Sequence, residues 1–448
     1  MPAKSQAQSD LEAPGAESRD TMWEMMERLF PLYRALCGPD FVASLEILKE
    51  YLDLEVLEFP TGQAIGEWTV PPEFKVNEAW VEDESGKRHL NFADHPYHLW
   101  IYSRPFDGVV TRDELVKKVS VDTHLPTAIP LRQTYYLDDW GFCATRKQVD
   151  ALPQGNYKVH IDTELKNGHL RIGEYYLPGD SKKEILIDSY LCHPRGANDN
   201  LSGIVVVTEL FRQLQRLGRR RLSYRLAIWP ESIGPITWIN TQREKIKNVI
   251  GGYEISICGN DSPIRFQKSR VGNGITDRAA LHVARHCVRD VTIEPYRHFS
   301  NGSDQGHFNM PGIRLPYCRI SRSGAGKEGY KEYHSSADDL TVVRPEFLLD
   351  TLQFSYLVIN VLDRAQVWAP TYVGTPFLSK RGVYPYHHGL GHGEYNRTDV
   401  SQTFYELMCA VDGENDLLQI ADDCDIFIGV FDEAVERFAE VDLIRPVS

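Results

Sequence analysis

The stretch Ile185–Gly203, ILIDSYLCHPRGANDNLSG, decides the fold of this 448-residue chain. Ile185–Ile187 is a short apolar run typical of a central strand that is buried on both faces of its sheet. The run continues through Ser189–Cys192 to His193, which would lie at the carboxyl end of the strand. Open α/β sheets place their chemistry at that end. We therefore predict an α/β fold with His193 in its functional site.

A polar turn follows this strand. Pro194 and Gly196 break the strand into a loop, and Asn198–Asn200 supplies turn-forming residues that carry oxygen ligands. An imidazole and a carboxylate on adjoining loops suit zinc, which makes His193 and Asp199 candidate metal ligands. Taken alone, the motif is equally compatible with a loop histidine beside an Asx turn and no metal.

A second strand end carries a candidate catalytic base. Ser223–Trp229, SYRLAIW, has the pattern of a strand, and the segment PESIG that follows places Glu231 just beyond it. A carboxylate beside a metal can take a proton from water and return it to a leaving amine. The alternative is an ion-pair partner or a charge at the start of a helix.

A third loop contributes a further histidine. Leu315–Ile320 has the pattern of a strand, and a Gly-rich loop leads from it to the motif YHSSADDL. We predict His334 of this motif as a third metal ligand.

Four motifs in this order, HPRGANDNLSGIVVVTEL, IWPESIG, GSDQGHF and YHSSADDL, resemble those of the co-catalytic zinc aminopeptidases. The sequence is most similar to their aminopeptidase-like branch, which has an inserted small β domain and a C-terminal winged helix. The resemblance covers most of the chain from about Thr21 onward. It implies an α/β fold with a mixed-sheet zinc-exopeptidase (phosphorylase/hydrolase-like) core.

The resemblance also implies roles for individual residues. His193 and His334 match zinc ligands, and Asp199 matches the carboxylate that bridges two metals in the parent family. Glu231 matches the general base. These four residues are our predicted catalytic and metal-binding set.

Two ligands of the parent family are missing from this sequence. The parent has a second glutamate directly after the base, where this chain has Ser232, and an aspartate where we align Ser256. A serine hydroxyl is a poor zinc ligand at neutral pH, so we predict one zinc ion per chain. The thiol of Cys192, directly before His193, is a minor alternative ligand.

Four residues are predicted to contact substrate. Because the lost aspartate also holds the substrate amine in the parent enzymes, strict aminopeptidase specificity is in doubt. Arg322 offers a planar fork to a substrate carboxylate, although it also fits a solvated loop. Asp304 is placed to orient a ligand. Tyr135 and Trp140 either wall a substrate pocket or fill a domain interface. We expect His307 to be a pocket or surface residue rather than a ligand.

The predicted function is zinc-dependent hydrolysis of an amide or peptide bond in a small peptide or biosynthetic intermediate, with Glu231 as general base. Two alternatives remain open. One is a catalytically degenerate aminopeptidase-like protein used for binding or assembly. The other is a deacylase of a modified sugar or a natural-product intermediate.

Changes in composition along the chain predict its organisation. Helical patterns at Met22–Leu36 and Asp40–Leu52 precede an aromatic-rich series of short strands. We predict a disordered leader at 1–20, a catalytic core at 21–59 and 147–368, an inserted β-rich domain at 60–146, and a winged-helix-like domain at 369–448.

Composition and charge restrict the partners. The chain has a net charge of −14, and its C-terminal part from Thr371 carries five Lys and Arg against fourteen Asp and Glu. Such a surface repels DNA phosphates, so we predict no nucleic-acid partner and an oligomer contact or a lid instead. No apolar run approaches a membrane span, and the leader lacks a signal-peptide core. Eight cysteines without a CxxC pair indicate reduced thiols.

We therefore expect a cytoplasmic homo-oligomer that acts on a small peptide or amide without membrane contact. The histidines of YPYHHGLGHGEY, which are His387, His388 and His392, are expected on an exposed loop rather than in a metal site.

Overall fold

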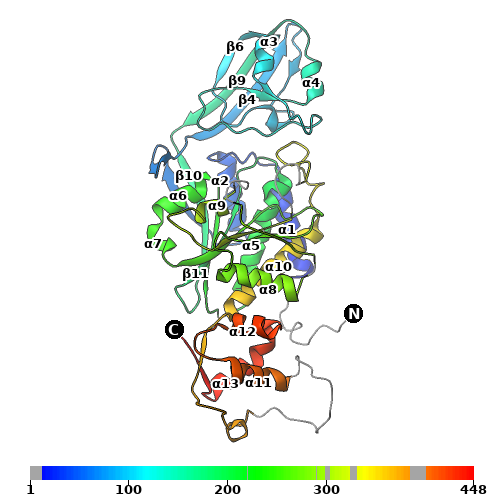
Figure 1. The fold of residues 1–448 in the computed structure, drawn as a ribbon. Helices are drawn as coiled ribbons and strands as arrows, with labels where there is room; N and C mark the ends of the chain where they lie inside the picture. The colour runs from blue at the N-terminus through cyan, green and yellow to red at the C-terminus, as the bar shows by residue number, and fades with distance from the viewer. Residues whose placement is uncertain are drawn as a thin grey trace.

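A computed structural model describes residues 13–218, 220–288, 290–297, 303–322, 330–383 and 400–447 (Figure 1). Figure 1 shows three parts in a row: a small sheet with β4, β6 and β9 at one end, a large sheet covered by helices in the middle, and α11, α12 and α13 at the other end.

The large sheet has eight strands in the order β1-β10-β12-β11-β13-β16-β14-β15. Strands β11, β12, β13 and β16 run parallel, β1 and β10 pair antiparallel with their neighbours, and β14 is antiparallel to β16 but parallel to β15. The carboxyl ends of the four parallel strands therefore meet at one edge. This confirms the predicted α/β class with a mixed sheet. The strands are β1 (Glu55–Pro60), β10 (His169–Leu177), β11 (Glu184–Tyr190), β12 (Ser223–Trp229), β13 (Val249–Ile255), β14 (Arg265–Gln267), β15 (Thr292–Glu294) and β16 (Tyr317–Ser321).

Both faces of this sheet are covered, as the apolar run in β11 predicts. Ile185 and Ile187 pack into one apolar core, and Leu186 packs into a second core on the opposite face. The first core is shared by α1 (Ala16–Leu29), α2 (Pro39–Lys49), α5 (Ser202–Arg216), α8 (Ile275–His286) and α10 (Pro345–Arg364). The second core is shared by α6 (Ile233–Thr241), α9 (Gln305–Phe308) and residues 64–166, which carry the small sheet and are called the small-sheet segment below. Helix α7 (Arg243–Ile246) follows α6.

The small sheet has the strand order β5-β4-β9-β6. Its central strand β9 (Asn156–Lys166) pairs with both β4 (Glu73–Asp83) and β6 (Phe106–Thr111). The small sheet therefore extends past the predicted boundary at residue 146, because β9 lies beyond that residue. The other elements of this part are β2 (Ala64–Ile65), β3 (Trp68–Thr69), β5 (Arg88–His89), η2 (Pro96–His98), α3 (Arg112–Lys117), β7 (Val119–Ser120), β8 (Phe142–Cys143) and α4 (Arg146–Asp150).

The two ends of the chain are helical. Helix α1 begins at Ala16, so the last five residues of the predicted leader are in fact ordered. Ser18 and Met22 are buried, which shows that packing extends this helix beyond its apolar pattern. The C-terminal part has η4 (Leu378–Arg381), α11 (Val400–Ala410), α12 (Leu417–Cys424), η5 (Ile428–Phe431) and α13 (Asp432–Glu440), with β17 (Trp368–Pro370) antiparallel to β18 (Ile444–Pro446).

His387, His388 and His392 lie outside the described residues. Within the described part of the chain, no helix combines the length and the apolar character that crossing a bilayer requires.

A buried ion-pair cluster stabilises the large sheet. The guanidinium of Arg225 on β12 lies 3.1 Å from carboxylate oxygens of both Glu174 and Glu184, and both acids are almost completely buried. Lys245 approaches Glu174 to 2.6 Å from α7. Removing Arg225 would leave Glu184 buried without an ion-pair partner among the residues that the structure describes.

We expect Arg225→Ala to lower the free energy of unfolding by about 3–5 kcal/mol, because an uncompensated buried charge is left behind. Urea titration measures the loss. Lys247→Ala is the matched control, since Lys247 pairs with Glu244 on the surface and its removal should leave the midpoint unchanged. Equal midpoints for both variants would contradict the structural role of the cluster.

Candidate metal centre

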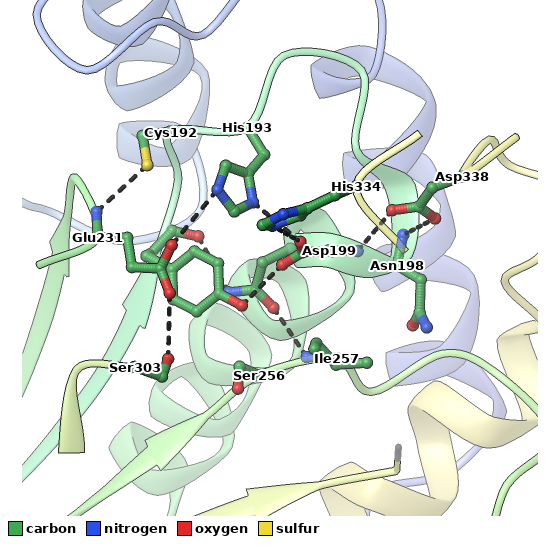
Figure 2. A network of polar contacts seen from close by, with 12 residues as sticks. Cys192, His193, Asn198, Asp199, Glu231, Ser256, Ile257, Ser303, His334 and Asp338 are labelled. Carbon is green, nitrogen blue, oxygen red and sulfur yellow. Dashed lines mark hydrogen bonds and ion pairs between the residues drawn. The ribbon is translucent and has the colours of Figure 1, made fainter. Parts of the chain in front are cut away.

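The candidate site lies at the shared edge of the parallel strands (Figure 2). His193 comes three residues after β11, Glu231 two residues after β12, and Ser256 directly after β13. His334 comes from the loop that precedes α10. The structure thus brings the predicted catalytic and metal-binding set to one place.

Two histidines converge on one carboxylate oxygen. Nδ1 of His193 and Nε2 of His334 each lie 3.1 Å from Oδ2 of Asp199. These three atoms are buried, and none of them has a hydrogen-bond partner. Two nitrogens and one oxygen that converge without hydrogen bonds are the donor set that zinc takes in catalytic sites. The residues present therefore fit a bound zinc ion.

The electrostatics also favour a cation here. Burial alone would lower the pKa of His193, but the neighbouring Asp199 raises that pKa well above its usual range. Burial acts on Asp199 in the opposite sense, and His193 and His334 together hold its pKa far below normal. The carboxylate therefore remains charged in a closed space, where a metal ion can balance it.

The other oxygen donors beside this set are hydrogen-bonded within the protein. The second oxygen of Asp199, Oδ1, accepts a hydrogen bond of 2.7 Å from the hydroxyl of Tyr190. The side chain of Ser256 is also engaged, since its Oγ donates to Glu254 at 2.8 Å and accepts from Nε of Arg319 at 3.0 Å. Both histidines and only one oxygen of Asp199 thus remain for a metal.

The two ligand loops are tied together by Asp338. Its carboxylate oxygens accept the backbone N–H groups of Asn198 and Asp199, each at 2.9 Å. Asp338 lies four residues after His334, so it joins the loop of one ligand to the loop of another (Figure 2). Burial, followed by the charge of Asp199, raises the pKa of Asp338 to about 7.

The turn that carries Asp199 is also attached to the end of β13. The side-chain oxygens of Asn200 and Asn198 accept the N–H groups of Ile257 and Gly259 at 2.9 and 2.8 Å. Ile257 has a φ of 53°, a left-handed conformation that is unfavourable for a β-branched residue. Such a conformation costs about 1–3 kcal/mol and persists where surrounding contacts impose it. The asparagine bonds supply such contacts.

Glu231 points into the site from a firmly held turn. Its Oε2 lies 3.4 Å from Nε2 of His193, and its Oε1 accepts from Ser303 Oγ at 3.2 Å. The backbone after Glu231 is fixed by Asp304, which accepts the N–H of Ser232 at 2.7 Å and the indole N–H of Trp229 at 2.8 Å. Asp304 therefore positions the turn of Glu231 and does not itself line the cavity.

A buried charge network backs this turn. Glu254 is completely buried and pairs with Nε of Arg319 at 3.2 Å. Ser303 Oγ contacts Glu254 at 2.7 Å as well as Glu231, so it links the two carboxylates. Burial, with the charge of Asp188 close by, raises the pKa of Asp304 well above its usual range.

A cavity of about 240 Å³ opens over these groups. Its polar walls include His193, Glu231 and His334, and Tyr135 comes to it from the small-sheet segment. The remaining lining residues are Leu36, Leu131, Gln133, Cys192 and Ser232. The cavity is large enough for the reacting part of a small substrate and joins two regions of the chain.

The small-sheet segment also pairs directly with the loop of His334. The N–H of Leu131 donates to the carbonyl of His334 at 2.7 Å, and the N–H of Ser336 donates to the carbonyl of Ile129 at 2.8 Å. One metal ligand is thus held partly by a segment outside the large sheet.

Two predicted substrate contacts lie elsewhere. Arg322 is only 3% exposed and is engaged by an ion pair with Asp350 and by bonds to Thr351 and the carbonyl of Ser262. It is a structural arginine outside the cavity, so we do not retain it as a carboxylate receptor. Trp140 stacks on Phe106 with ring centroids 4.3 Å apart, which is packing within the small-sheet part.

His307 is half-buried and lies outside the described cavity lining. The thiol of Cys192 lines the cavity and accepts the N–H of Glu231 at 3.3 Å, and burial raises its pKa to about 12. A neutral thiol in that position contacts the base rather than the three converging ligand atoms.

Sequence reasoning did not identify Asp338, Tyr190, Glu254 and Arg319. A usable signal was present for two of them, because Glu254 and Arg319 are charged residues within otherwise apolar strand patterns. Charged side chains are almost never buried unless they are paired, so each indicates a partner at the same sheet edge.

Comparisons with known proteins agree with this geometry. The family profile described as a domain of unknown function (DUF4910) matches residues 23–365. A Clostridium acetobutylicum protein, provisionally named for polysaccharide biosynthesis with an aminopeptidase-like domain, is 32% identical over 91% of this chain and 92% of its own length.

Solved structures show the same fold. A crystal structure from Clostridium acetobutylicum, described provisionally as a peptidase, superposes with a TM-score of 0.85 at 28% identity and covers 96% of this chain and 97% of its own. A zinc aminopeptidase from Bacillus subtilis superposes with a TM-score of 0.57 at 12% identity, covering 76% of this chain and 93% of its own. A Shewanella amazonensis peptidase M28 precursor gives 0.54 at 13% identity, covering 80% and 94%. The latter two show likeness of fold alone.

The clamp made by Asp338 should control metal affinity. In Asp338→Asn, the amide has one acceptor oxygen, so one of the two loop N–H groups faces an NH₂ group. We expect zinc affinity, measured by competition with a chromogenic chelator, to fall about 10–100-fold. Asp339→Asn is the matched control, because Asp339 accepts only from Thr341 at the surface. Unchanged affinity in Asp338→Asn would show that the clamp does not act on the metal ligands.

Proposed function

Because this chain belongs to the family of the domain of unknown function DUF4910, whose large-sheet fold it shares with zinc aminopeptidases, we propose that it is a zinc-dependent hydrolase of an amide bond. The observation that carries the proposal is the convergence beside Glu231, in an open cavity, of three buried ligand atoms that have no hydrogen bond within the described part of the chain.

His193, Asp199 and His334 would hold a single zinc ion. When bound, zinc polarises an amide carbonyl and lowers the pKa of water. Glu231 then acts as general base: its carboxylate takes a proton from water and delivers that proton to the departing nitrogen. Its side chain is 20% exposed, which gives it access to the cavity while the Ser303 hydroxyl fixes one oxygen.

The cavity favours a neutral amide over a free carboxylate at the cleaved end. Its described lining contains no lysine or arginine, and Arg322 is engaged elsewhere. A carboxylate would therefore meet Glu231 without a side-chain cation to balance it. Release of a residue from the carboxyl end of a peptide is the less favoured specificity.

A catalytically inactive binding or assembly protein is the competing proposal. It leaves unexplained why Glu231 is aimed into the cavity by Ser303 and by the turn that Asp304 holds. The name of the Clostridium relative favours a substrate from a biosynthetic reaction over a peptide that is degraded as a nutrient.

We propose that the small-sheet segment is the inserted domain and that residues 369–448 are a winged helix. The three helices α11, α12 and α13 with the β17–β18 pair support the latter. Its acidic composition suits a contact between subunits or a lid rather than DNA.

Replacing Glu231 should separate chemistry from metal binding. We expect Glu231→Gln to reduce kcat on a blocked dipeptide or acetylated amine at least 100-fold, because the amide cannot accept the water proton. Its zinc content, measured by atomic emission, should equal that of the wild type. His193→Ala should lose the metal, whereas His124→Ala, at an exposed position, should change neither quantity. Full turnover in Glu231→Gln would disprove the assignment, and absence of zinc from the wild type would favour the binding protein.

A further inference from the structure

Aromatic rings lead from the cavity to the surface. Tyr135 lines the cavity, and its ring centroid lies 4.6 Å from that of Tyr136. The ring of Tyr136 lies 5.7 Å from that of Trp68 on β3. We call these three residues the aromatic shelf. It is continuous with the proposed catalytic cavity and comes entirely from the small-sheet segment.

The outer rings of the shelf are open to solvent but fixed in place. Trp68 is 45% exposed and Tyr136 is 48% exposed. The hydroxyl of Tyr136 donates to the carbonyl of Thr69 at 2.6 Å, which anchors its ring beside β3. Grouped, exposed and rigid aromatic side chains are typical of binding sites, because tryptophan and tyrosine offer large contact areas at little conformational cost.

An open shelf selects a particular kind of ligand. An aryl or alkyl group is best buried in a closed pocket, whereas the shelf covers only one side of its occupant. A pyranose ring has an apolar face of C–H groups and a polar rim of hydroxyls, so it can stack on an indole or phenol while its rim stays in water or meets polar side chains. Gln133 lines the cavity beside Tyr135 and supplies an amide for such hydroxyls.

The charge of the cavity lining restricts the class of ligand further. Since no lysine or arginine lines the described cavity, the charged group of a phosphorylated or carboxylated sugar would have to pair with the zinc ion proposed above and would compete with the acyl carbonyl for it. A sugar that carries a neutral amide can stack on the aromatic shelf and needs no cationic side chain in the cavity. Its acyl carbonyl fits beside the metal ligands, and its rings fit the shelf.

From these observations, and resting on the hydrolase proposed above, we propose that the substrate is an N-acylated amino sugar within an oligosaccharide, with the sugar beyond the reacting one stacked on Trp68 and Tyr136. Water adds to the acyl carbon and the carbon–nitrogen bond breaks. The products are a carboxylate and the amino sugar, whose nitrogen receives the proton that Glu231 took from water. No redox partner or co-reactant is required.

Binding can be tested apart from turnover. The full chain with Glu231→Gln, loaded with zinc, is titrated calorimetrically with N,N′-diacetylchitobiose and, separately, with N-acetylphenylalanine amide. We expect the disaccharide to bind, and we expect its Kd to rise at least tenfold on adding Trp68→Ala or Tyr136→Ala. Tyr136→Phe keeps the ring but loses the bond to Thr69, so we expect its Kd to rise less than that of Tyr136→Ala.

Phe377→Ala is the matched control, because Phe377 is an aromatic residue 71% exposed on the C-terminal part and should not affect the Kd. Circular dichroism melting confirms that each variant is folded, and Tyr136→Phe covers the case in which a truncation is unstable. Absence of disaccharide binding, equal Kd values in the shelf variants, or shelf-dependent binding of N-acetylphenylalanine amide alone would each overturn the sugar assignment.

The outcomes for the shelf and for catalysis are distinguishable. Shelf-dependent disaccharide binding without acetate release by the zinc-loaded wild type contradicts the hydrolase and supports the sugar site. Cleavage of simple acetylated amines without disaccharide binding contradicts the sugar site and supports the hydrolase.

Discussion

The two hydrogen bonds that Asp338 accepts from Asn198 and Asp199 are the constraint on which the candidate site depends. They join loops that are about 140 residues apart in sequence, one at the end of β11 and one ahead of α10. These bonds help to hold the 3.1 Å approach of Asp199 and His334, together with a backbone bond of 3.2 Å from the N–H of Ala197 to the carbonyl of Asp338. The same turn is fixed to the end of β13 through Asn198 and Asn200, so two strand ends and a distant loop are held together.

A second layer of interactions supplies charge balance behind the ligands. Arg319 is a buried cation that neutralises Glu254. The hydroxyl of Ser303 contacts both Glu254 and Glu231, so it connects Glu231 to this ion pair. Ser256 takes part in this network as a hydrogen-bonding residue between Glu254 and Arg319. Ser256, which we aligned with an aspartate of the zinc aminopeptidases, therefore takes part in the internal ion pair of this protein. The ion pair with Arg319 compensates the buried charge of Glu254.

The parts of this structure that could be predicted are those set by local pattern. The apolar run before His193 and the strand before Glu231 placed both residues at sheet ends, and strand order then brought them together. Pairings across long distances could not be predicted in the same way. Arg322 pairs with Asp350 on α10, and nothing in the local sequence indicates that partner. The alternating pattern of β9 predicts a strand, but it does not indicate which sheet the strand joins. Asp338 is part of the motif YHSSADDL, but the two N–H groups that donate to its carboxylate lie on another loop. Its role in joining the two loops could therefore be recognised only from the three-dimensional fold.

The pairing of Leu131 with His334 has a thermodynamic consequence. The backbone of one metal ligand is shared between the loop before α10 and a segment that also carries Tyr135 into the cavity. Any ligand that shifts the balance of conformations of that segment also shifts the conformations available to His334. Linkage is reciprocal, so a molecule that tightens the hold on the metal must itself bind more tightly to the metal-loaded protein, by the same factor. A metal ion held by His334 and a molecule bound beside Tyr135 would therefore be energetically coupled.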